Sequence, residues 1–324
     1  MKEKLLDCVK ANEEQMIQLL SDMVKIPSVS GEEEKLAEFV NDYCKKLGFE
    51  SEIDRHGNVL AILKGKRPGK RIAFNSHLDT VPVGDGWDSD PFSGKVEDGK
   101  LWGRGSTDCK AAIAAQIIAA KSMVDAGIDF AGEIALMYPV DEEVQDISRK
   151  GTLKMLQDGF TADMCVNGED TDLKLCLVCE GMLEIKVTTY GVGAHGATPY
   201  KGVNAIGNMC KVYNEIQKIV PGTNKYAGSG SINPGVICGG ERSSVVPDRC
   251  EMKVSRFTVP GENGELFLKQ VNEIINKLKE EDPTFDAKVE LTYDSNPSIV
   301  SEDAEIVKAV ANRKRVPALW NASA

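Results

Sequence analysis

The sequence predicts an α/β protein with a second, α+β domain. Up to about Gly168, short apolar runs alternate with segments of helical periodicity, as they do in α/β proteins. From Met182 the order changes to strand, helix, two strands, helix and strand, which is the order of a ferredoxin-like domain. The length of 324 residues is sufficient for two domains.

The first region begins with two expected helices. Apolar side chains at helical spacing indicate one helix over residues 3–26, which should stop before Pro27. Ser30 and Glu33 form a Ser-x-x-Glu capping box in front of a second helix, which ends at Gly48. Further strands are expected at residues 49–54, 58–63, 71–75, 133–140 and 162–166, and further helices at 110–126 and 152–156.

In the second region the strand from Met182 to Thr189 alternates apolar and polar side chains, as a strand with one solvent-exposed face does. A helix at 302–313 should follow this region and return the chain to the first domain. The elements between them are a helix at 204–220, strands at 232–238 and 249–257, a helix at 262–279 and a strand at 287–293.

Composition excludes several functional classes. A formal net charge of -11 argues against nucleic-acid binding through phosphates. No apolar run approaches ~20 residues and the N-terminus has no signal-peptide core, so we expect neither a membrane span nor a secreted protein. Nine cysteines without a framework spacing indicate reduced thiols and a cytoplasmic location. A nucleotide-dependent enzyme is disfavoured because the chain lacks a phosphate loop and a dinucleotide fingerprint.

Acidic side chains and one histidine follow the expected strands of the first region. His77 and Asp79 stand two residues apart on extended chain, so their side chains point to the same side. Asp108 precedes a helix, while residues 141–143 and Glu169 follow further strands. Ligands bind at the carboxyl ends of strands in open α/β sheets, and zinc accepts histidine nitrogen and carboxylate oxygen. The pattern therefore predicts a hydrolytic metal site.

Each of these residues also has a simpler interpretation. Asp108 alone would be a helix N-cap, although one carboxylate can serve as a cap and as a ligand. The three adjacent acids at 141–143 alone would be a solvated loop, and Glu169 an ordinary loop acid. Their recurrence at the ends of strands favours the metal site.

Several motifs occur in a fixed order along nearly the whole chain. They are Ser76-His-Leu-Asp-Thr-Val-Pro82, Trp102-Gly-Arg-Gly-Ser-Thr-Asp108-Cys-Lys110, Asp141-Glu-Glu143, Gly168-Glu169, Gly193-Ala-His195-Gly, and Gly239-Gly240 followed by Val245-Val246-Pro247-Asp248. With these motifs in this order and rough spacing, the sequence resembles the aminoacylases and M20-type metallopeptidases. Acetylornithine deacetylase and succinyl-diaminopimelate desuccinylase belong to this family, and the opening of the chain is most similar to the YgeY-type peptidases.

The resemblance implies a mixed-sheet catalytic domain of the zinc-exopeptidase type. Residues 1–179 would form its first part, and residues 180–294 an inserted ferredoxin-like lid and dimerisation domain. Residues 295–324 would return to the catalytic domain and leave it incomplete. The expected partners are a second copy of the chain, bound through the inserted domain, and a small N-acyl amino acid or peptide substrate, with no nucleic acid and no membrane.

The resemblance also implies the metal ligands. His77, Asp108 and Glu169 would bind one Zn²⁺, and Asp108 would bridge to a second ion held by Glu143. Co²⁺ and Mn²⁺ are the alternative ions. Asp79 would hydrogen-bond the second ring nitrogen of His77 and so fix its tautomer.

The implied reaction is hydrolysis of an amide by metal-activated water, with Glu142 as the general base that passes a proton to the leaving amine. His195 in the inserted domain would donate to the developing oxyanion; its simpler interpretation is a histidine that caps a turn. Arg256 would clamp a substrate carboxylate, unless it is a surface residue of its strand, and Asn233 is a weaker candidate for the same role.

The sequence departs from the family pattern at its end and in a few substitutions. Family members run on for several dozen residues and supply a last metal-binding histidine, a place that His56, His77 and His195 do not fill. We therefore keep a second hypothesis, an inactive or weakened metal-binding relative with a regulatory or binding role. Serines replace the usual acid and amide at positions 255 and 244, and Cys109 follows Asp108 in place of a more usual residue, a change that we interpret as a packing difference.

Overall fold

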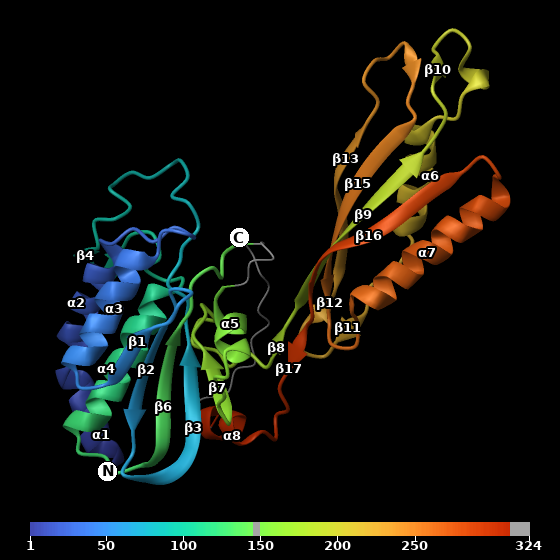
Figure 1. Ribbon diagram of the computed structural model, residues 1–324. Coiled ribbons are helices and arrows are strands. Elements are labelled where there is room, and N and C mark those ends of the chain that lie inside the picture. The colour runs from blue at the N-terminus through green and yellow to red at the C-terminus, as the bar shows by residue number, and fades with distance from the viewer. Residues whose placement is uncertain (145–149, 312–324) are drawn as a thin grey trace. The chain divides into compact units, whose positions relative to one another are not determined.

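The computed structural model describes residues 1–144 and 150–311. Contacts divide the chain into two compact units, Met1–Asp170 and Thr171–Ala324, each with its own sheet (Figure 1). The expected fold class is confirmed, because one sheet is mixed and the other is antiparallel. The division into 1–179, 180–294 and 295–324 stays a prediction, and residues 312–324 of its last part lie outside the described residues.

The first unit contains a five-stranded sheet of order β1-β2-β6-β3-β7. Strands β1 (Glu50–Ile53), β2 (Val59–Lys64) and β6 (Ala131–Tyr138) are antiparallel neighbours. Strand β3 (Arg67–Asn75) is parallel to both β6 and β7 (Met164–Asn167). The carboxyl ends of β3, β6 and β7 therefore meet at one edge of the sheet, where three of the predicted site motifs begin.

Helices lie on both faces of this sheet (Figure 1). Apolar side chains of α2, α3 and α4 form one core with β2 and β6, in which Leu36, Ile113 and Leu136 are almost completely buried. Met155 of α5 contributes to a smaller core on the other face, against Ala135. The helices are α1 (Lys2–Ala11), α2 (Glu13–Val24), α3 (Glu34–Lys46), α4 (Lys110–Asp125) and α5 (Thr152–Gln157), and a hairpin of β4 (Lys95–Glu97) and β5 (Lys100–Trp102) lies between β3 and α4.

The expected single helix over residues 3–26 is two helices, because the chain breaks at Asn12. The side-chain amide of Asn12 donates to Ser122 Oγ at 3.0 Å and to Asp125 Oδ2 at 2.8 Å, both on α4. These polar contacts fix the junction between α1 and α2 against α4, which a pattern of apolar residues does not reveal.

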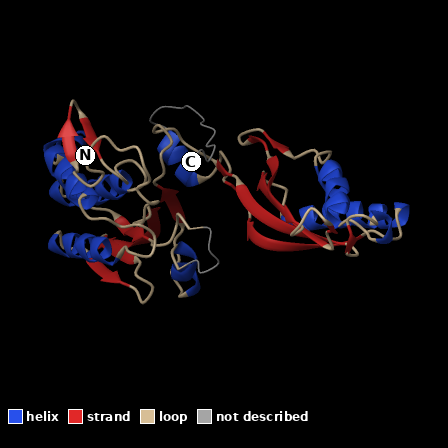
Figure 2. Ribbon diagram, turned by 90° about the horizontal axis from the view of Figure 1, so that it is seen from above, coloured by secondary structure: helices blue, strands red, loops and turns tan. Residues whose placement is uncertain are grey.

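The second unit contains an antiparallel sheet of order β13-β15-β9-β16, with the apolar faces of α6 and α7 against it (Figure 2). Ile185, Val254 and Phe267 are almost completely buried in this core. The predicted β-α-β-β-α-β order is confirmed by β9 (Gly181–Tyr190), α6 (Ala205–Ile216), β13 (Ser231–Gly239), β15 (Arg249–Thr258), α7 (Gly264–Glu281) and β16 (Asp286–Ser295).

Short elements complete the second unit. The expected helix at 302–313 is present as α8 (Glu305–Ala311), and residues 312 and 313 lie outside the described residues. The other elements are β8 (Val178–Cys179) paired with β17 (Ser298–Ile299), β10 (Ala194–His195) paired with β14 (Val245–Val246), β11 (Thr223–Asn224) paired with β12 (Gly228–Ser229), and a 3₁₀ turn at Pro199–Lys201.

All nine cysteines are free thiols, as the sequence predicts. Within residues 1–144 and 150–311, no helix has the length and apolar character that a membrane crossing requires.

A buried lysine fixes the start of α4. Lys110 is completely buried, and its Nζ donates to the backbone oxygens of Met23 at 3.1 Å and Ile26 at 2.9 Å, at the end of α2. Burial lowers the pKa of this amine to about 8. The contact holds the residues directly before α4, including Asp108, at the edge of the sheet.

The Lys110→Met variant removes this amine. In the wild type the pKa of Lys110 falls from 10.5 in the unfolded chain to about 8 on folding. Between these pH values the unfolded state binds more protons, so wild-type stability gains from rising pH. We therefore expect the free energy of unfolding of the variant to fall relative to wild type by about 3 kcal/mol across this window, measured by urea denaturation.

Lys35→Met, at an exposed position of α3, is the matched control, and its stability difference from wild type should not change across the same pH window. A constant difference for Lys110→Met as well would contradict a depressed pKa for the buried amine.

Candidate metal centre

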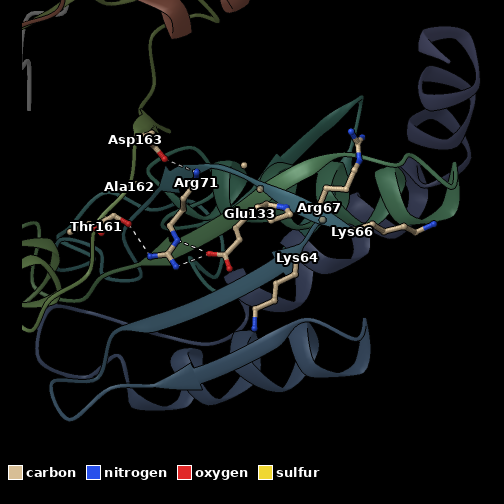
Figure 3. Close-up of a pocket in the computed structure, with 12 residues that line it drawn as sticks. Lys64, Lys66, Arg67, Arg71, Glu133, Thr161, Ala162 and Asp163 are labelled. Atoms are coloured by element: carbon tan, nitrogen blue, oxygen red, sulfur yellow. Dashed lines mark hydrogen bonds and ion pairs between the residues drawn. The ribbon is translucent and has the colours of Figure 1, made fainter.

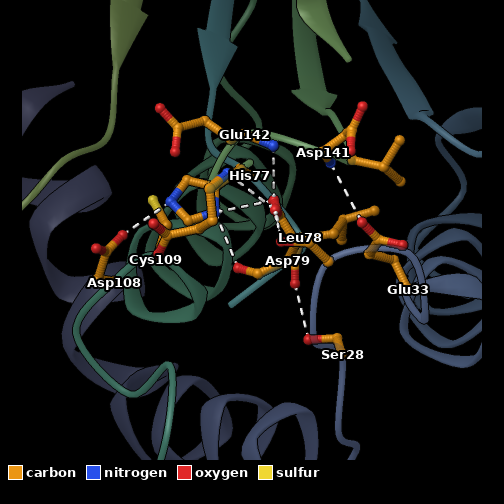
Figure 4. Close-up of polar contacts among 12 residues, drawn as sticks. Ser28, Glu33, His77, Leu78, Asp79, Asp108, Cys109, Asp141 and Glu142 are labelled. Atoms are coloured by element: carbon orange, nitrogen blue, oxygen red, sulfur yellow. Dashed lines mark hydrogen bonds and ion pairs between the residues drawn. The ribbon is translucent and has the colours of Figure 1, made fainter. Parts of the chain in front are cut away.

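The predicted ligands of the first metal ion converge at the carboxyl edge of the mixed sheet. Figure 4 shows His77 beside Asp108 and Cys109. His77 follows β3, Glu169 follows β7, and Asp108 lies just before α4. One ligand atom from each of these three side chains, together with Cys109 Sγ, lies within 4.8 Å of the others. Glu143 follows β6 and does not belong to this group. Three segments that are far apart in the sequence thus supply donors to one small volume.

The imidazole of His77 is held at both ring nitrogens and is almost completely buried. Nδ1 lies 2.9 Å from the backbone oxygen of Asp79 and 3.3 Å from its Oδ1, as expected for a carboxylate that fixes the tautomer. Nε2 lies 2.8 Å from Asp108 Oδ1. Burial lowers the pKa of His77, but the hydrogen bonds to Asp108 and Asp79 outweigh it and raise the pKa to about 12. The ring therefore lies where positive charge is strongly favoured.

The carboxylate of Asp79 is completely buried and supports the loop that carries the two glutamates. It accepts hydrogen bonds from Ser30 Oγ at 2.7 Å, from the backbone nitrogen of Glu142 at 3.1 Å and from that of Glu143 at 3.0 Å. Burial raises the pKa of Asp79, but the hydrogen bonds from His77 and Ser30 outweigh it, and the pKa is lowered. A single carboxylate thus positions both the imidazole and the loop.

The predicted capping box of Ser30 and Glu33 is wrong. Helix α3 begins at Glu34, and Glu33 in front of it makes no side-chain cap hydrogen bond. Ser30 donates to Asp79 instead, and Glu33 Oε1 accepts a hydrogen bond from the backbone nitrogen of Asp141 at 3.2 Å. Both side chains support the site, a role that the Ser-x-x-Glu pattern does not distinguish from capping.

The acidic groups of the site disfavour one another's negative charge. Burial raises the pKa of Glu142, Glu143 and Glu169, and the charge of Asp108 adds to this effect at each of them. The pKa of Glu169 reaches about 7. Taken over all its atoms, Glu142 is exposed to solvent. Its carboxyl group nevertheless lies close enough to His77 for their charges to interact. Such a set of oxygen, nitrogen and sulfur donors fits a divalent cation of the zinc type.

A small pocket of about 200 Å³ lies next to this centre, and Thr80, Arg104, Asp108 and Glu143 are among its lining residues. The guanidinium carbon of Arg104 lies 5.4 Å from the ring centroid of Trp87. The ring of Trp87 therefore packs against Arg104, a residue of the pocket wall.

A larger pocket of about 730 Å³ lies at the opposite edge of the same sheet, among the amino ends of β3 and β6 (Figure 3). Lys64, Lys66 and Arg67 in its wall point away from one another, and Arg71 pairs with Glu133 at 2.6 Å. None of the metal-donor residues lines this pocket. Size alone does not identify the functional site.

His195 and Asn233 lie in the second unit. His195 is exposed on β10, where its Nδ1 accepts a hydrogen bond from the backbone nitrogen of Ala197 at 3.1 Å, a turn contact of the kind expected from its simpler interpretation. Asn233 is exposed on β13. The roles of both residues in catalysis and substrate binding stay predictions.

Arg256 does not fit the predicted substrate clamp. The residue is 1% exposed, its Nη2 forms an ion pair with Glu262, and its Nη1 donates to Gln270 Oε1 at 2.8 Å. Its guanidinium carbon lies 4.7 Å from the ring centroid of Phe267. These contacts hold β15 against α7. Both earlier interpretations, a clamp and a surface arginine, give way to a buried structural arginine.

The sequence matches proteins of a known family. The model of peptidase family M20/M25/M40 matches residues 73–315. The YgeY protein of Escherichia coli K12 is 29% identical over 324 aligned residues, which cover 95% of this chain and 80% of that protein. Succinyl-diaminopimelate desuccinylase of Rickettsia akari is 30% identical over 283 residues, which cover 81% of this chain and 73% of the enzyme.

Solved structures share the fold. Aminopeptidase PepT of Bacillus cereus has a TM-score of 0.78 at 21% identity and covers 97% of this chain and 85% of its own. The YxeP protein of Bacillus subtilis, described as a dinuclear metal-binding peptidase, has a TM-score of 0.72 at 17% identity and covers 96% of this chain and 83% of its own. The family match extends over most of the chain, and the protein therefore belongs to peptidase family M20/M25/M40.

Proposed function

We propose that this protein is a metal-dependent hydrolase that cleaves the amide bond of an N-acyl amino acid or a short peptide. The observation that carries the proposal is the convergence of His77, Asp108 and Glu169 at the sheet edge, beside a loop that presents Glu142. Relatives named as a desuccinylase and as peptidases act on bonds of this type. Membership of the peptidase family supports a hydrolytic reaction. The converging donor atoms support a bound metal ion.

His77, Asp108 and Glu169 would hold one Zn²⁺, and Asp108 with Glu143 would hold a second ion, with Co²⁺ or Mn²⁺ as substitutes. A bound divalent cation of this kind polarises a carbonyl group and lowers the pKa of water to about 7. A bound ion would displace the proton from Nε2 of His77. The contacts of Nδ1 with the backbone oxygen and the carboxylate of Asp79 would keep the remaining ring hydrogen on Nδ1.

Glu142 would act as the general base. Its carboxylate does not belong to the four-donor group, and its backbone is fixed by the hydrogen bond to Asp79 at 3.1 Å. Burial raises the pKa of Glu142 toward the range in which a carboxylate accepts and returns protons efficiently near neutral pH. Glu142 takes a proton from the attacking water and delivers it to the nitrogen of the leaving amine.

The substrate would place a small group in the pocket of about 200 Å³ beside Asp108 and Glu143. We retain His195 as the proposed oxyanion donor, Asn233 as a substrate contact, and a homodimer formed through residues 180–294. Arg256 is left out because its guanidinium is buried against Glu262. A substrate carboxylate would therefore be bound by residues other than Arg256.

A weakened or inactive metal-binding relative is the second candidate, and the surroundings of Glu143 favour it. Glu143 lies outside the four-donor group, and Asp108 is the only other ligand proposed for the second ion. The other histidine of the first unit, His56, lies in a turn where its Nε2 is 3.3 Å from Asp158. Hydrolysis of acylated amino acids and dipeptides by the zinc-loaded protein would exclude this candidate.

Glu142→Gln tests the general base. The variant keeps the proposed ligands and loses the proton acceptor, so we expect unchanged zinc stoichiometry and a fall in kcat of roughly 10² to 10⁴-fold. Glu38→Gln, an exposed acid on α3, is the control and should keep full turnover. A zinc-loaded Glu142→Gln protein with wild-type turnover would rule out the role.

Asp79→Asn tests how the site is held. The substitution removes the buried charge beside His77 Nδ1 and weakens an acceptor for two backbone nitrogens. We expect zinc affinity to fall by about 10 to 100-fold, measured by isothermal titration calorimetry. Asp42→Asn, at an exposed position of α3, should bind zinc like the wild type. Equal affinities for all three proteins would show that Asp79 does not support the imidazole.

A further inference from the structure

We propose that Cys109 is the fourth ligand of the ion held by His77, Asp108 and Glu169, which makes this a zinc site with one thiolate. The inference rests on the proposed metal site and adds to it a donor that sequence reasoning assigned to packing. It also predicts which metals the site prefers.

The geometry carries the inference. Ligand atoms of His77, Asp108, Cys109 and Glu169 all lie within 4.8 Å of one another, and no other such group of His, Cys, Asp and Glu side chains converges this closely in the described parts of the chain. Four donors from imidazole, carboxylate and thiolate are the number and kind that zinc takes in its usual tetrahedral sites. Zinc can expand from four to five ligands, so a position for the attacking water remains beside the four protein donors.

The Cys109 sulfur is placed by the start of α4 and is contacted by the loop after β7. Cys109 is the N-cap residue of α4 and follows Asp108 directly, and its side chain is completely buried. Its Sγ contacts the backbone oxygen of Gly168, the residue before Glu169. A side chain at Gly168 would come within 2.6 Å of Ala112 Cβ, so glycine lets the loop after β7 approach the start of α4. The thiol therefore lies between two segments that carry ligands.

Burial alone does not explain this placement, as a comparison with Cys44 shows. Cys44 is equally buried, but it belongs to the apolar core between α3 and the sheet. Cys109 instead lies beside an imidazole and two carboxylates. When the ion binds, the S–H bond of Cys109 breaks, a sulfur–metal bond forms, and the proton leaves to solvent.

A thiolate ligand changes the metal preference of the site. Sulfur donors favour Zn²⁺ and Co²⁺, whereas sites made of carboxylate and water suit Mg²⁺ and Mn²⁺. We therefore expect zinc to displace manganese from this protein. In Cys109→Ser the difference between the affinities for zinc and for manganese should become smaller.

Titration of the metal-free protein with Co²⁺ tests the proposal, because a cobalt–thiolate bond gives an intense charge-transfer absorption in the near ultraviolet. We expect this band in the wild type with cobalt bound at the site. Cys109→Ser should lose the band and bind cobalt at least about 10-fold more weakly, an effect as large as that of removing a supporting residue. The control Cys44→Ser should keep both the band and the affinity.

The outcomes separate this inference from the proposed function. Cobalt bound without the band in the wild type, or a band that persists in folded Cys109→Ser, would overturn the thiolate ligand and leave the metal site intact. A protein that binds no cobalt would overturn both. Should the variant misfold, X-ray absorption of the zinc-loaded wild type at the zinc edge decides. A sulfur neighbour at about 2.3 Å supports the proposal, and a shell of nitrogen and oxygen neighbours alone contradicts it.

Discussion

The buried carboxylate of Asp79 is the contact on which the candidate site depends. It lies against His77 Nδ1 and accepts hydrogen bonds from the backbone of Glu142 and Glu143, so one residue sets the orientation of a proposed ligand and the position of a proposed base. Ser30, from the segment before α3, supplies its remaining contact. An uncompensated buried charge would be costly, and these partners together satisfy it.

Much of the fold could be predicted because its causes are local or periodic. The order of apolar residues predicts the alternation in β9 and the points where β3, β6 and β7 end. Because these three strands pair in parallel, His77 and Glu169 lie at one edge of the sheet. The convergence of His77, Asp108 and Glu169 was expected from the family motifs, and the structure brings the three together.

Other features depend on contacts between distant segments, which a single sequence does not display. Ser30 and Glu33 have the spacing of a capping box, yet their partners are Asp79 and the backbone of Asp141, roughly a third of the chain away for Glu33. In the sequence Arg256 suggests a substrate-binding residue, but in the structure its guanidinium forms an ion pair with Glu262. Cys109 looks like a packing substitution until Gly168 brings the loop after β7 to its sulfur. In each case the side chain has an ordinary local interpretation that a tertiary contact overrides.

The central claim is that a divalent cation occupies the space between β3, β7 and the start of α4. A crystal structure of the zinc-loaded protein, with anomalous scattering measured at the zinc edge, tests it most directly. The account predicts an anomalous peak that places the zinc ion within bonding distance of His77 Nε2, Asp108 and Glu169. A structure in which His77 Nε2 keeps its hydrogen bond to Asp108 Oδ1 and zinc binds elsewhere or not at all would contradict it.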